Sequence, residues 1–358
     1  MQLSHRLGFL VPAVRRLWHA RNALLRERDN LLEAARDLSI EITALRLRLE
    51  PTGALNAQTT SDAGAELHRI REEDASLRSQ GRRVDFEYGY DPQPRPREAL
   101  RRRLEPVLAA NAKSYFDQLA KFAAFTPQLL DIAASADHAS ADPGWINGHM
   151  PGLDAVSIYG FLASTNPQRY VEVGSGNSTK FARQAIKDHG LRTRIVSIDP
   201  SPRAEVDAIC DEVIRTPCER VDPNFFKGIS SEDVLFVDNS HRSFPNSDVT
   251  VFFTDILPAL SPGVLFGVHD IWTPDDYPSQ WRDRWYNEQY LLEAYLLGGF
   301  QSDEIVLPAW WVSGQPKIMA VLSPLFQNPR LSGVSPHGGA FWFRRLNSQG
   351  GSIEVSGK

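Results

Sequence analysis

Cysteine is scarce in this chain. Only two cysteines, Cys210 and Cys218, occur among its 358 residues. Two cysteines cannot form the disulfide framework of a small secreted domain, and such a composition suits a reducing compartment. Apolar residues make up 42% of the chain, which is enough for burial to stabilise a sizeable core. The composition therefore predicts a cytoplasmic globular protein.

An excess of basic charge and long apolar runs are lacking as well. The formal net charge is −5, with 39 Lys and Arg against 44 Asp and Glu. Because neutralising phosphates needs clustered basic residues, we do not expect a general nucleic-acid binder. The apolar run from Leu7 to Val14 is short and is interrupted by Pro12. It matches neither a membrane span nor a signal peptide, so we expect neither.

The N-terminal part of the chain, residues 1–80, carries a repeat of leucine. Leucine recurs at intervals of seven, at Leu17, Leu24, Leu31, Leu38 and Leu45. This pattern is typical of a helix that pairs with another helix, although Arg21 and Arg28 interrupt the second heptad position. Residues 14–49 are therefore predicted to form a coiled coil that makes the protein a homo-oligomer. The alternative is a single amphipathic helix that packs on its own domain.

Residues 81–144 are expected to form a linker followed by covering helices. Asp91 to Pro96 is rich in proline, which indicates an extended linker. Residues 98–134 have helical periodicity with a kink or break expected at Pro106, and their aromatic side chains are expected to pack. A basic run is interpreted as a solvated face, with an anionic partner as the alternative; it consists of Arg95, Arg97, Arg101, Arg102 and Arg103.

Residues 145–346 alternate apolar strands with helices. We expect strands at residues 169–173, 193–199, 212–215, 233–238, 264–268, 304–312 and 317–322, and a helix at residues 281–297. Nearly continuous apolar strands between helices predict an α/β fold with a mostly parallel sheet covered on both faces. The short spacing of the last two strands predicts an antiparallel pair. The polar tail, residues 347–358, is expected to be disordered.

A glycine turn follows the first of these strands. Gly174 and Gly176 allow a ligand to approach the backbone closely, and Ser178 or Thr179 could cap the helix that follows. A strand, a glycine turn and a helix in this order form a nucleotide-binding corner. Asp199 ends the second strand, where such folds place a ribose-binding carboxylate. NAD is a rival ligand, but Thr179 occupies the position of the third glycine in the dinucleotide fingerprint.

Together these residues resemble the class I S-adenosylmethionine-dependent methyltransferases. The resemblance implies a Rossmann-like sheet and S-adenosylmethionine as the cofactor. It places the methionine part at the acidic residue of the first strand and at the glycine turn, and the ribose hydroxyls at the carboxylate after the second strand. The implied cofactor-binding residues are Glu172, Gly174, Ser175, Gly176, Asn177, Ser178 and Asp199.

Four polar residues lie at the ends of two later strands. Asp238 and His241 follow strand 233–238, and His269 and Asp270 follow strand 264–268. Two carboxylates on neighbouring strand ends can share a hard cation such as Mg²⁺. A neutral histidine nearby could remove a substrate proton, because its pKa lies near neutral pH. These residues therefore predict a catalytic cluster; the alternative is that each histidine is a hydrogen-bonded packing residue.

The sequence around this cluster resembles the bacterial branch called methyltransferase family 24 and its macrolide-sugar O-methyltransferase relatives. The resemblance implies methyl transfer to a hydroxyl of a small molecule or sugar. It implies that Asp238 and Asp270 bind Mg²⁺ and that His241 is the catalytic base. Ile271 follows Asp270, where catechol-type relatives carry asparagine. The third metal ligand is therefore open, and His269 is a candidate.

Two other functions are compatible with the same residues. His241, His269 and one carboxylate could form the iron site of a hydroxylase-like enzyme. The chain could also be a non-catalytic assembly module in which the heptad helix is the functional part. The aromatic residues in segment 275–290 suit a sugar or planar acceptor, with helix packing as the alternative.

Overall fold

The computed structural model describes residues 95–136, 140–202, 206–298 and 303–346. These residues all belong to one unit, Gln93–Lys358. The predicted helical region 1–80 with its coiled coil at residues 14–49, most of the predicted linker and the tail 347–358 lie outside the described residues. None of the helices within the described ranges has both the length and the apolar character that crossing a membrane requires.

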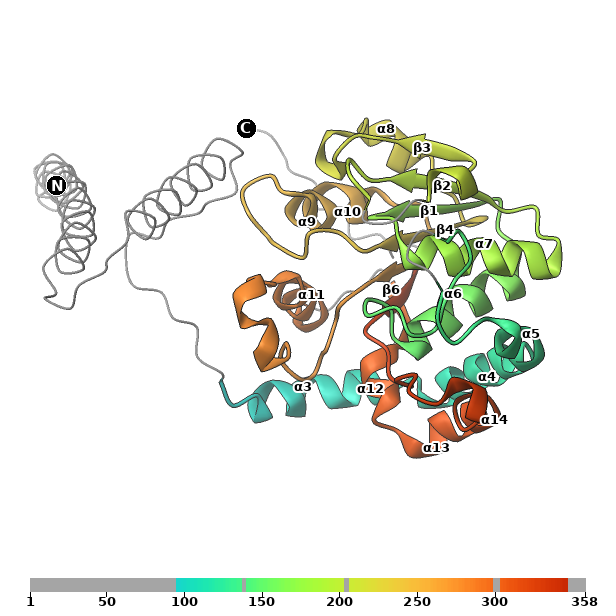
Figure 1. The fold of residues 1–358 in the computed structure, drawn as a ribbon. Helices are drawn as coiled ribbons and strands as arrows, with labels where there is room; N and C mark the ends of the chain where they lie inside the picture. Colours follow the sequence, from blue (N-terminus) through green and yellow to red (C-terminus); the bar gives the residue numbers. More distant parts are fainter. Residues whose placement is uncertain (1–94, 137–139, 203–205, 299–302, 347–358) are drawn as a thin grey trace, which may run out of the picture. The chain divides into compact units, whose positions relative to one another are not determined.

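The core of this unit is a seven-stranded sheet with the strand order β3-β2-β1-β4-β5-β7-β6 (Figure 1). The first five strands along the chain run parallel, and β7 runs antiparallel to both β5 and β6. The predicted Rossmann-like fold is confirmed. The strands are β1 (Arg169–Val173), β2 (Arg194–Ile198), β3 (Glu212–Ile214), β4 (Asp233–Val237), β5 (Leu265–Val268), β6 (Asp303–Pro308) and β7 (Phe341–Arg345).

The register of the parallel strands aligns their carboxyl ends. Val173 of β1 is paired with Ile198 of β2 and with Val237 of β4, and Val237 is paired with Val268 of β5. The strand order reverses between β1 and β4, and ligands of doubly wound sheets bind at such a switch point, outside the carboxyl ends. The polar residues that follow these four strands therefore meet at one edge of the sheet.

The helices between strands cover the sheet. The crossover from β1 to β2 and the crossover from β4 to β5 run in opposite directions along the sheet, so right-handed connections place their helices on opposite faces. Strand residues are accordingly buried on both faces. The helices involved are α7 (Asn177–His189), α8 (Pro223–Lys227), α9 (Asp248–Val251) and α10 (Leu257–Ala259), with short helical turns η1 (Asp207–Ile209), η2 (Cys218–Arg220) and η3 (Phe252–Ile256).

The predicted covering helices precede β1. They are α3 (Glu98–Ala109), α4 (Ala112–Ala123), α5 (Thr126–Asp131) and α6 (Gly152–Thr165). Pro106 lies inside α3, and the chain breaks between α3 and α4 at Ala110 and Asn111 rather than at the proline. The aromatic side chains Tyr115 and Phe122 are fully buried, which confirms the packing role expected of them.

Near the C-terminal end one predicted strand is wrong and another is too long. Residues 317–322 are helical, because Pro316 opens a helical turn whose apolar residues pack inward; an apolar run this short does not distinguish strand from helix. Strand 304–312 ends at Pro308, where a helix begins. The antiparallel partner of β6 is instead β7. The elements concerned are α12 (Ala309–Ser313), α13 (Pro316–Met319), η5 (Ala320–Leu322), α14 (Ser323–Phe326) and η6 (Pro329–Leu331).

The segment after β5 is also divided differently from the prediction. A single helix was expected from Trp281, but the chain forms the 3-10 helix η4 (Ser279–Arg284) and then α11 (Glu288–Leu297). Trp285 separates them with a φ of 58°, a left-handed conformation that no continuous α-helix contains. Trp281, Arg284 and Tyr286 lie on the two sides of this break and line the cavity described below.

Candidate active site

A cavity of about 670 Å³ lies at the carboxyl ends of the parallel strands. Its lining includes the glycine turn after β1, the residues after β2, β4 and β5, and the η4 segment. This size suits a cofactor and a small substrate together. Its lining includes these residues predicted from the sequence, which lie close after the ends of strands: Ser175, Asn177, Asp199, Asp238, His241, His269 and Asp270.

Gly174 holds the glycine turn against the neighbouring strand. Its φ is +83°, and a Cβ added there would lie 1.7 Å from the carbonyl oxygen of Asp238. No other residue fits this contact, so the turn and the end of β4 are fixed to each other. Gly176 differs: a Cβ there would meet nothing within 4 Å. Helix α7 begins directly after it, so its first amide groups and Asn177 lie at the cavity.

Asp199 is oriented by backbone amides. Its two carboxylate oxygens accept hydrogen bonds from Ser175 N at 2.9 Å and from Ser201 N at 2.7 Å. Both Asp199 and Ser175 line the cavity. A carboxylate has further lone pairs beyond these two, which leaves Asp199 able to accept from ribose hydroxyls.

Glu172 lies beneath the glycine turn and does not line the cavity. It is fully buried and accepts hydrogen bonds from the hydroxyls of Tyr170, at 2.8 Å, and Thr179. Burial raises the pKa of Glu172 to about 7, against the opposing effect of its hydrogen bonds. Ser178 is buried as well and is likewise absent from the cavity wall. These two predicted cofactor residues therefore support the turn from below, while Thr179 links Glu172 to the Gly176 amide.

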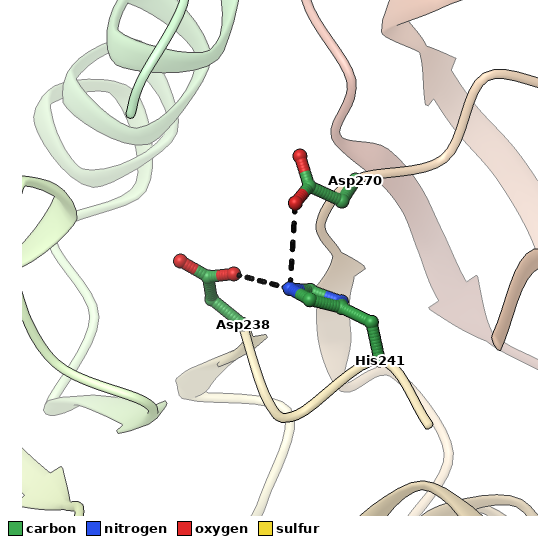
Figure 2. A group of neighbouring side chains, drawn as sticks. All are labelled: Asp238, His241 and Asp270. Atoms are coloured by element: carbon green, nitrogen blue, oxygen red, sulfur yellow. Dashed lines mark ion pairs between the residues drawn. The ribbon is translucent and has the colours of Figure 1, made fainter. Parts of the chain in front are cut away.

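Asp238, His241 and Asp270 converge at the cavity wall (Figure 2). His241 Nε2 lies 3.2 Å from Asp238 Oδ1 and 3.4 Å from Asp270 Oδ2. His241 and Asp270 have φ angles of 58° and 55°, which are uncommon for residues other than glycine and are found mainly where a site requires them. The structure thus brings together the three residues predicted to be catalytic.

Glu288 orients His241, and the sequence analysis missed it. His241 Nδ1 lies 2.9 Å from Glu288 Oε2, and the other Glu288 oxygen accepts from Asn239 Nδ2 at 3.0 Å. Glu288 is fully buried although it opens a helix. Burial opposes protonation of His241, but the hydrogen bonds to Asp238 and Glu288 outweigh it and raise its pKa well above the usual value. A glutamate at the start of a helix resembles an ordinary capping residue in sequence, so nothing marked it.

His269 bridges two carboxylates rather than joining the cluster. Its Nδ1 lies 3.2 Å from Asp238 Oδ1, and its Nε2 lies 3.1 Å from Asp154 Oδ2. Burial opposes protonation of His269, but the charges of Asp238 and Asp270 raise its pKa well above the usual value. Its Nε2 is held by Asp154, and within the described residues His269 does not belong to the group whose ligand atoms converge. Asp154 was not predicted, although an acidic residue within an otherwise apolar helix was the available signal.

The geometry of the cluster fits a divalent cation. Ligand atoms of Asp238, His241 and Asp270 all lie within 4.8 Å of one another. Neighbouring ligands of an octahedral cation at about 2.1 Å lie about 3 Å apart, close to the two distances above. Among the described residues no group with His269 meets this criterion, so the two-histidine iron arrangement has no geometric support.

Residues 171–271 match the family described as "Methyltransferase domain". The matched segment begins in β1 and ends just after β5, so it contains the glycine turn, Asp199 and the Asp238–His241–Asp270 cluster. Residues 171–271 therefore form a methyltransferase domain. A search of curated proteins finds no match.

Solved methyltransferase structures are similar to the chain at low identity. One is the MycE methyltransferase of mycinamycin biosynthesis with Mg and SAH, at 15% identity and a TM-score of 0.32, over 56% of this chain and 50% of MycE. PaMTH1 of Podospora anserina, bound to SAH, is 15% identical at a TM-score of 0.34, over 72% of this chain and 100% of PaMTH1. The O-methyltransferase TomG of Streptomyces achromogenes is 14% identical at a TM-score of 0.31, over 53% of this chain and 78% of TomG. The chain thus spans half the length of MycE.

Proposed function

We propose that this domain methylates a hydroxyl oxygen of a small-molecule or sugar acceptor, with His241 as the base. The observation that carries the proposal is the convergence of Asp238, His241 and Asp270 at the cavity wall, with His241 held from behind by Glu288. A hydroxyl is a poor nucleophile until its proton is removed, and positioned bases contribute about 10²–10⁴-fold to such steps.

His241 is placed to receive the acceptor proton. Glu288 accepts from the Nδ1 side, so in the neutral imidazole the proton is held on Nδ1 and Nε2, which lies beside Asp238 and Asp270, is the nitrogen that can take a proton. The two aspartates flank Nε2 and leave the cavity side of the cluster for the acceptor. The proton would therefore move from the acceptor hydroxyl to Nε2, and the hydroxyl oxygen would take the methyl group as the sulfur–methyl bond of the cofactor breaks, with S-adenosylhomocysteine as the leaving group.

The residues present fit the cofactor. The amides at the start of α7 and the carboxylate of Asp199 offer donors and acceptors to a ligand with both charges and ribose hydroxyls. S-adenosylmethionine, when bound, supplies the methyl group. In this proposal Ser175, Gly176 and Asn177 contact it directly, whereas Glu172, Gly174 and Ser178 shape the turn.

Asp238 and Asp270 are proposed to hold a divalent cation such as Mg²⁺. When bound, it would supply positive charge that polarises the hydroxyl and favours the neutral form of His241. If His241 were instead the third ligand, its one available lone pair could not also take the proton. The two roles predict different results for His241→Ala. If His241 is the base, the variant keeps its affinity for the cation. If His241 is a metal ligand, the variant loses that affinity.

The proposal is tested by calorimetry followed by an acceptor screen. Calorimetry should show S-adenosylmethionine binding that Asp199→Asn weakens by about tenfold, because a charged hydrogen bond is lost. Transfer of labelled methyl groups to hydroxylated aromatics and sugars is then measured with Mg²⁺ and with chelator. Absence of cofactor binding would reject the function itself. Full turnover in chelator would leave the function intact but make Asp238 and Asp270 hydrogen-bonding residues.

The heptad leucines support one further part of the proposal. Residues 14–49 are proposed to make the protein a homo-oligomer, since five leucines at intervals of seven form a continuous apolar stripe on a helix. A cytoplasmic location is proposed on the scarcity of cysteine alone.

A further inference from the structure

The cavity wall has an unusual balance of charge. Its lining includes five carboxylates, from Asp199, Glu219, Asp238, Asp248 and Asp270. Arg284 is the one lysine or arginine among the lining residues. Unlike the histidines of the lining, Arg284 is positively charged at every working pH, so it can favour an anionic group that the carboxylates would otherwise repel.

The guanidinium of Arg284 lies over aromatic rings and has no carboxylate partner among the described residues. Its guanidinium carbon lies 4.1 Å from the centroid of the Trp281 ring and 5.6 Å from that of Tyr286. No ion pair with Arg284 is formed within the described ranges. Stacking holds the guanidinium plane, so its N–H groups stay available for a ligand.

A second arginine anchors this segment. Arg242 Nε donates to the carbonyl oxygen of Arg284 at 2.7 Å, and Arg242 NH1 donates to the Ser240 carbonyl at 3.1 Å. The Arg242 guanidinium also lies 5.1 Å from the centroid of Tyr286. The end of η4 is therefore tied to the turn that carries His241.

Tyr286 connects Arg284 with the catalytic cluster. Its ring lies 4.6 Å from the His241 ring, centroid to centroid, and also contacts the Arg284 guanidinium. A hydroxyl at His241 and an anionic group at Arg284 are thus separated by about one aromatic side chain. A ring-sized acceptor can reach both.

We propose that Arg284 binds an anionic group, a carboxylate or a phosphate, on the methyl acceptor while the acceptor ring lies against Trp281 and Tyr286. This inference rests on the proposed function, because it places the reactive hydroxyl at His241. The acceptor class is a hydroxylated ring, aromatic or sugar, that carries one negative charge. Arg284 is a specificity-determining residue in this account, not a catalytic one.

The test measures binding of simple charged and neutral rings to the full-length protein. Benzoate, phenyl phosphate and neutral benzamide are titrated with and without S-adenosylhomocysteine, by calorimetry. We expect benzoate or phenyl phosphate to bind at least about tenfold more tightly than benzamide, as a charge-assisted hydrogen bond provides. The comparison of benzoate with phenyl phosphate identifies the preferred anion.

Three variants test whether Arg284 causes the tighter binding of anionic rings. Arg284→Gln should abolish it, and Arg284→Lys should retain part of it, because lysine keeps the charge but not the planar fork. Arg282→Gln is the matched control on the same helix; Arg282 is exposed and does not line the cavity, and its variant should keep the full preference. Circular dichroism confirms that each variant is folded.

The proposal is overturned if the wild-type protein shows no preference for charge, or if the preference survives in Arg284→Gln. It is also overturned if Arg284→Gln weakens S-adenosylhomocysteine binding and leaves the ring preference unchanged, since Arg284 would then serve the cofactor. These outcomes are independent of turnover. A protein that binds no S-adenosylmethionine rejects the proposed function, while the ring titrations without cofactor still decide the role of Arg284.

Discussion

His269 joins Asp154 of α6 to Asp238 at the end of β4. Its Nε2 lies 3.1 Å from Asp154 Oδ2 and its Nδ1 lies 3.2 Å from Asp238 Oδ1. Asp154 also accepts from the Gly339 and Ala340 amides at 2.7 and 2.8 Å. One buried carboxylate therefore holds a helix, the segment before β7 and the histidine behind the catalytic cluster together.

Asp154→Asn should destabilise the fold. The amide cannot accept all three hydrogen bonds, so a buried donor is left unpaired and the His269 charge loses a partner. We expect the free energy of unfolding to fall by about 3 kcal/mol in urea denaturation. Asp188→Asn is the control, since Asp188 is exposed and its loss should cost less than about 1 kcal/mol. Equal losses for both variants would contradict this role.

Glu172 should make stability depend on pH. Burial raises its pKa in the folded protein to about 7, from an ordinary value of 4.5. Because the folded state binds this proton more tightly, its contribution is fully present below about pH 4.5 and is lost as the pH rises to about 7. The loss is on the order of 3 kcal/mol.

Glu172→Gln isolates this contribution. The variant lacks the titrating group. As the pH rises from 4.5 to 7.5, the free energy of unfolding of the wild type should therefore fall relative to that of the variant. Chemical denaturation at several pH values measures it. A difference that stays constant over this range would show that Glu172 titrates normally in the fold.

Gly174 and Gly176 should respond differently to alanine. Gly174→Ala places a Cβ against the Asp238 carbonyl at a residue with positive φ. We expect the free energy of unfolding to fall by more than about 2 kcal/mol and cofactor binding to be lost. Gly176→Ala meets no neighbour within 4 Å and should leave the stability of the free protein within about 1 kcal/mol. Thermal melting of both variants checks this. Equal melting temperatures would remove the packing argument for Gly174.

Deletion of residues 14–49 should give a monomer that still binds S-adenosylmethionine. The reason is the apolar leucine stripe, which needs a partner helix to be buried. Light scattering of the full-length and the deleted protein measures the change. A full-length protein that is already monomeric at high concentration would contradict the coiled coil.

Short-range sequence signals predicted the parallel half of the sheet and the residues at its carboxyl ends. Near-continuous apolar strands and the glycine turn are local features, and Asp199, Asp238 and Asp270 follow their strands directly. Contacts between distant segments could not be predicted in this way. Asp154 meets His269 across 115 positions, and Glu288 meets His241 across 47. The ambiguous apolar run at 317–322 was resolved by packing and by Pro316, not by its periodicity.

Two arginines of the basic run at residues 95–103 also make contacts with distant segments that the sequence did not predict. Arg97 pairs with Asp276 and Glu293, and Arg101 pairs with Asp275. Both arginines were expected on a solvated face. They instead connect the start of α3 to α11 and to the segment between β5 and α11, and no sequence pattern indicates these contacts. Arg97 is the more buried of the two, with 13% of its side chain exposed against 49% for Arg101.

The most direct test of the account is the rate of methyl transfer by His241→Ala at saturating S-adenosylmethionine and acceptor. The account predicts a loss of about 10²–10⁴-fold with cofactor and cation affinity unchanged, and partial recovery on addition of imidazole, because the missing group is a proton acceptor. A variant that transfers methyl groups at the wild-type rate would contradict the assignment of His241 as the base.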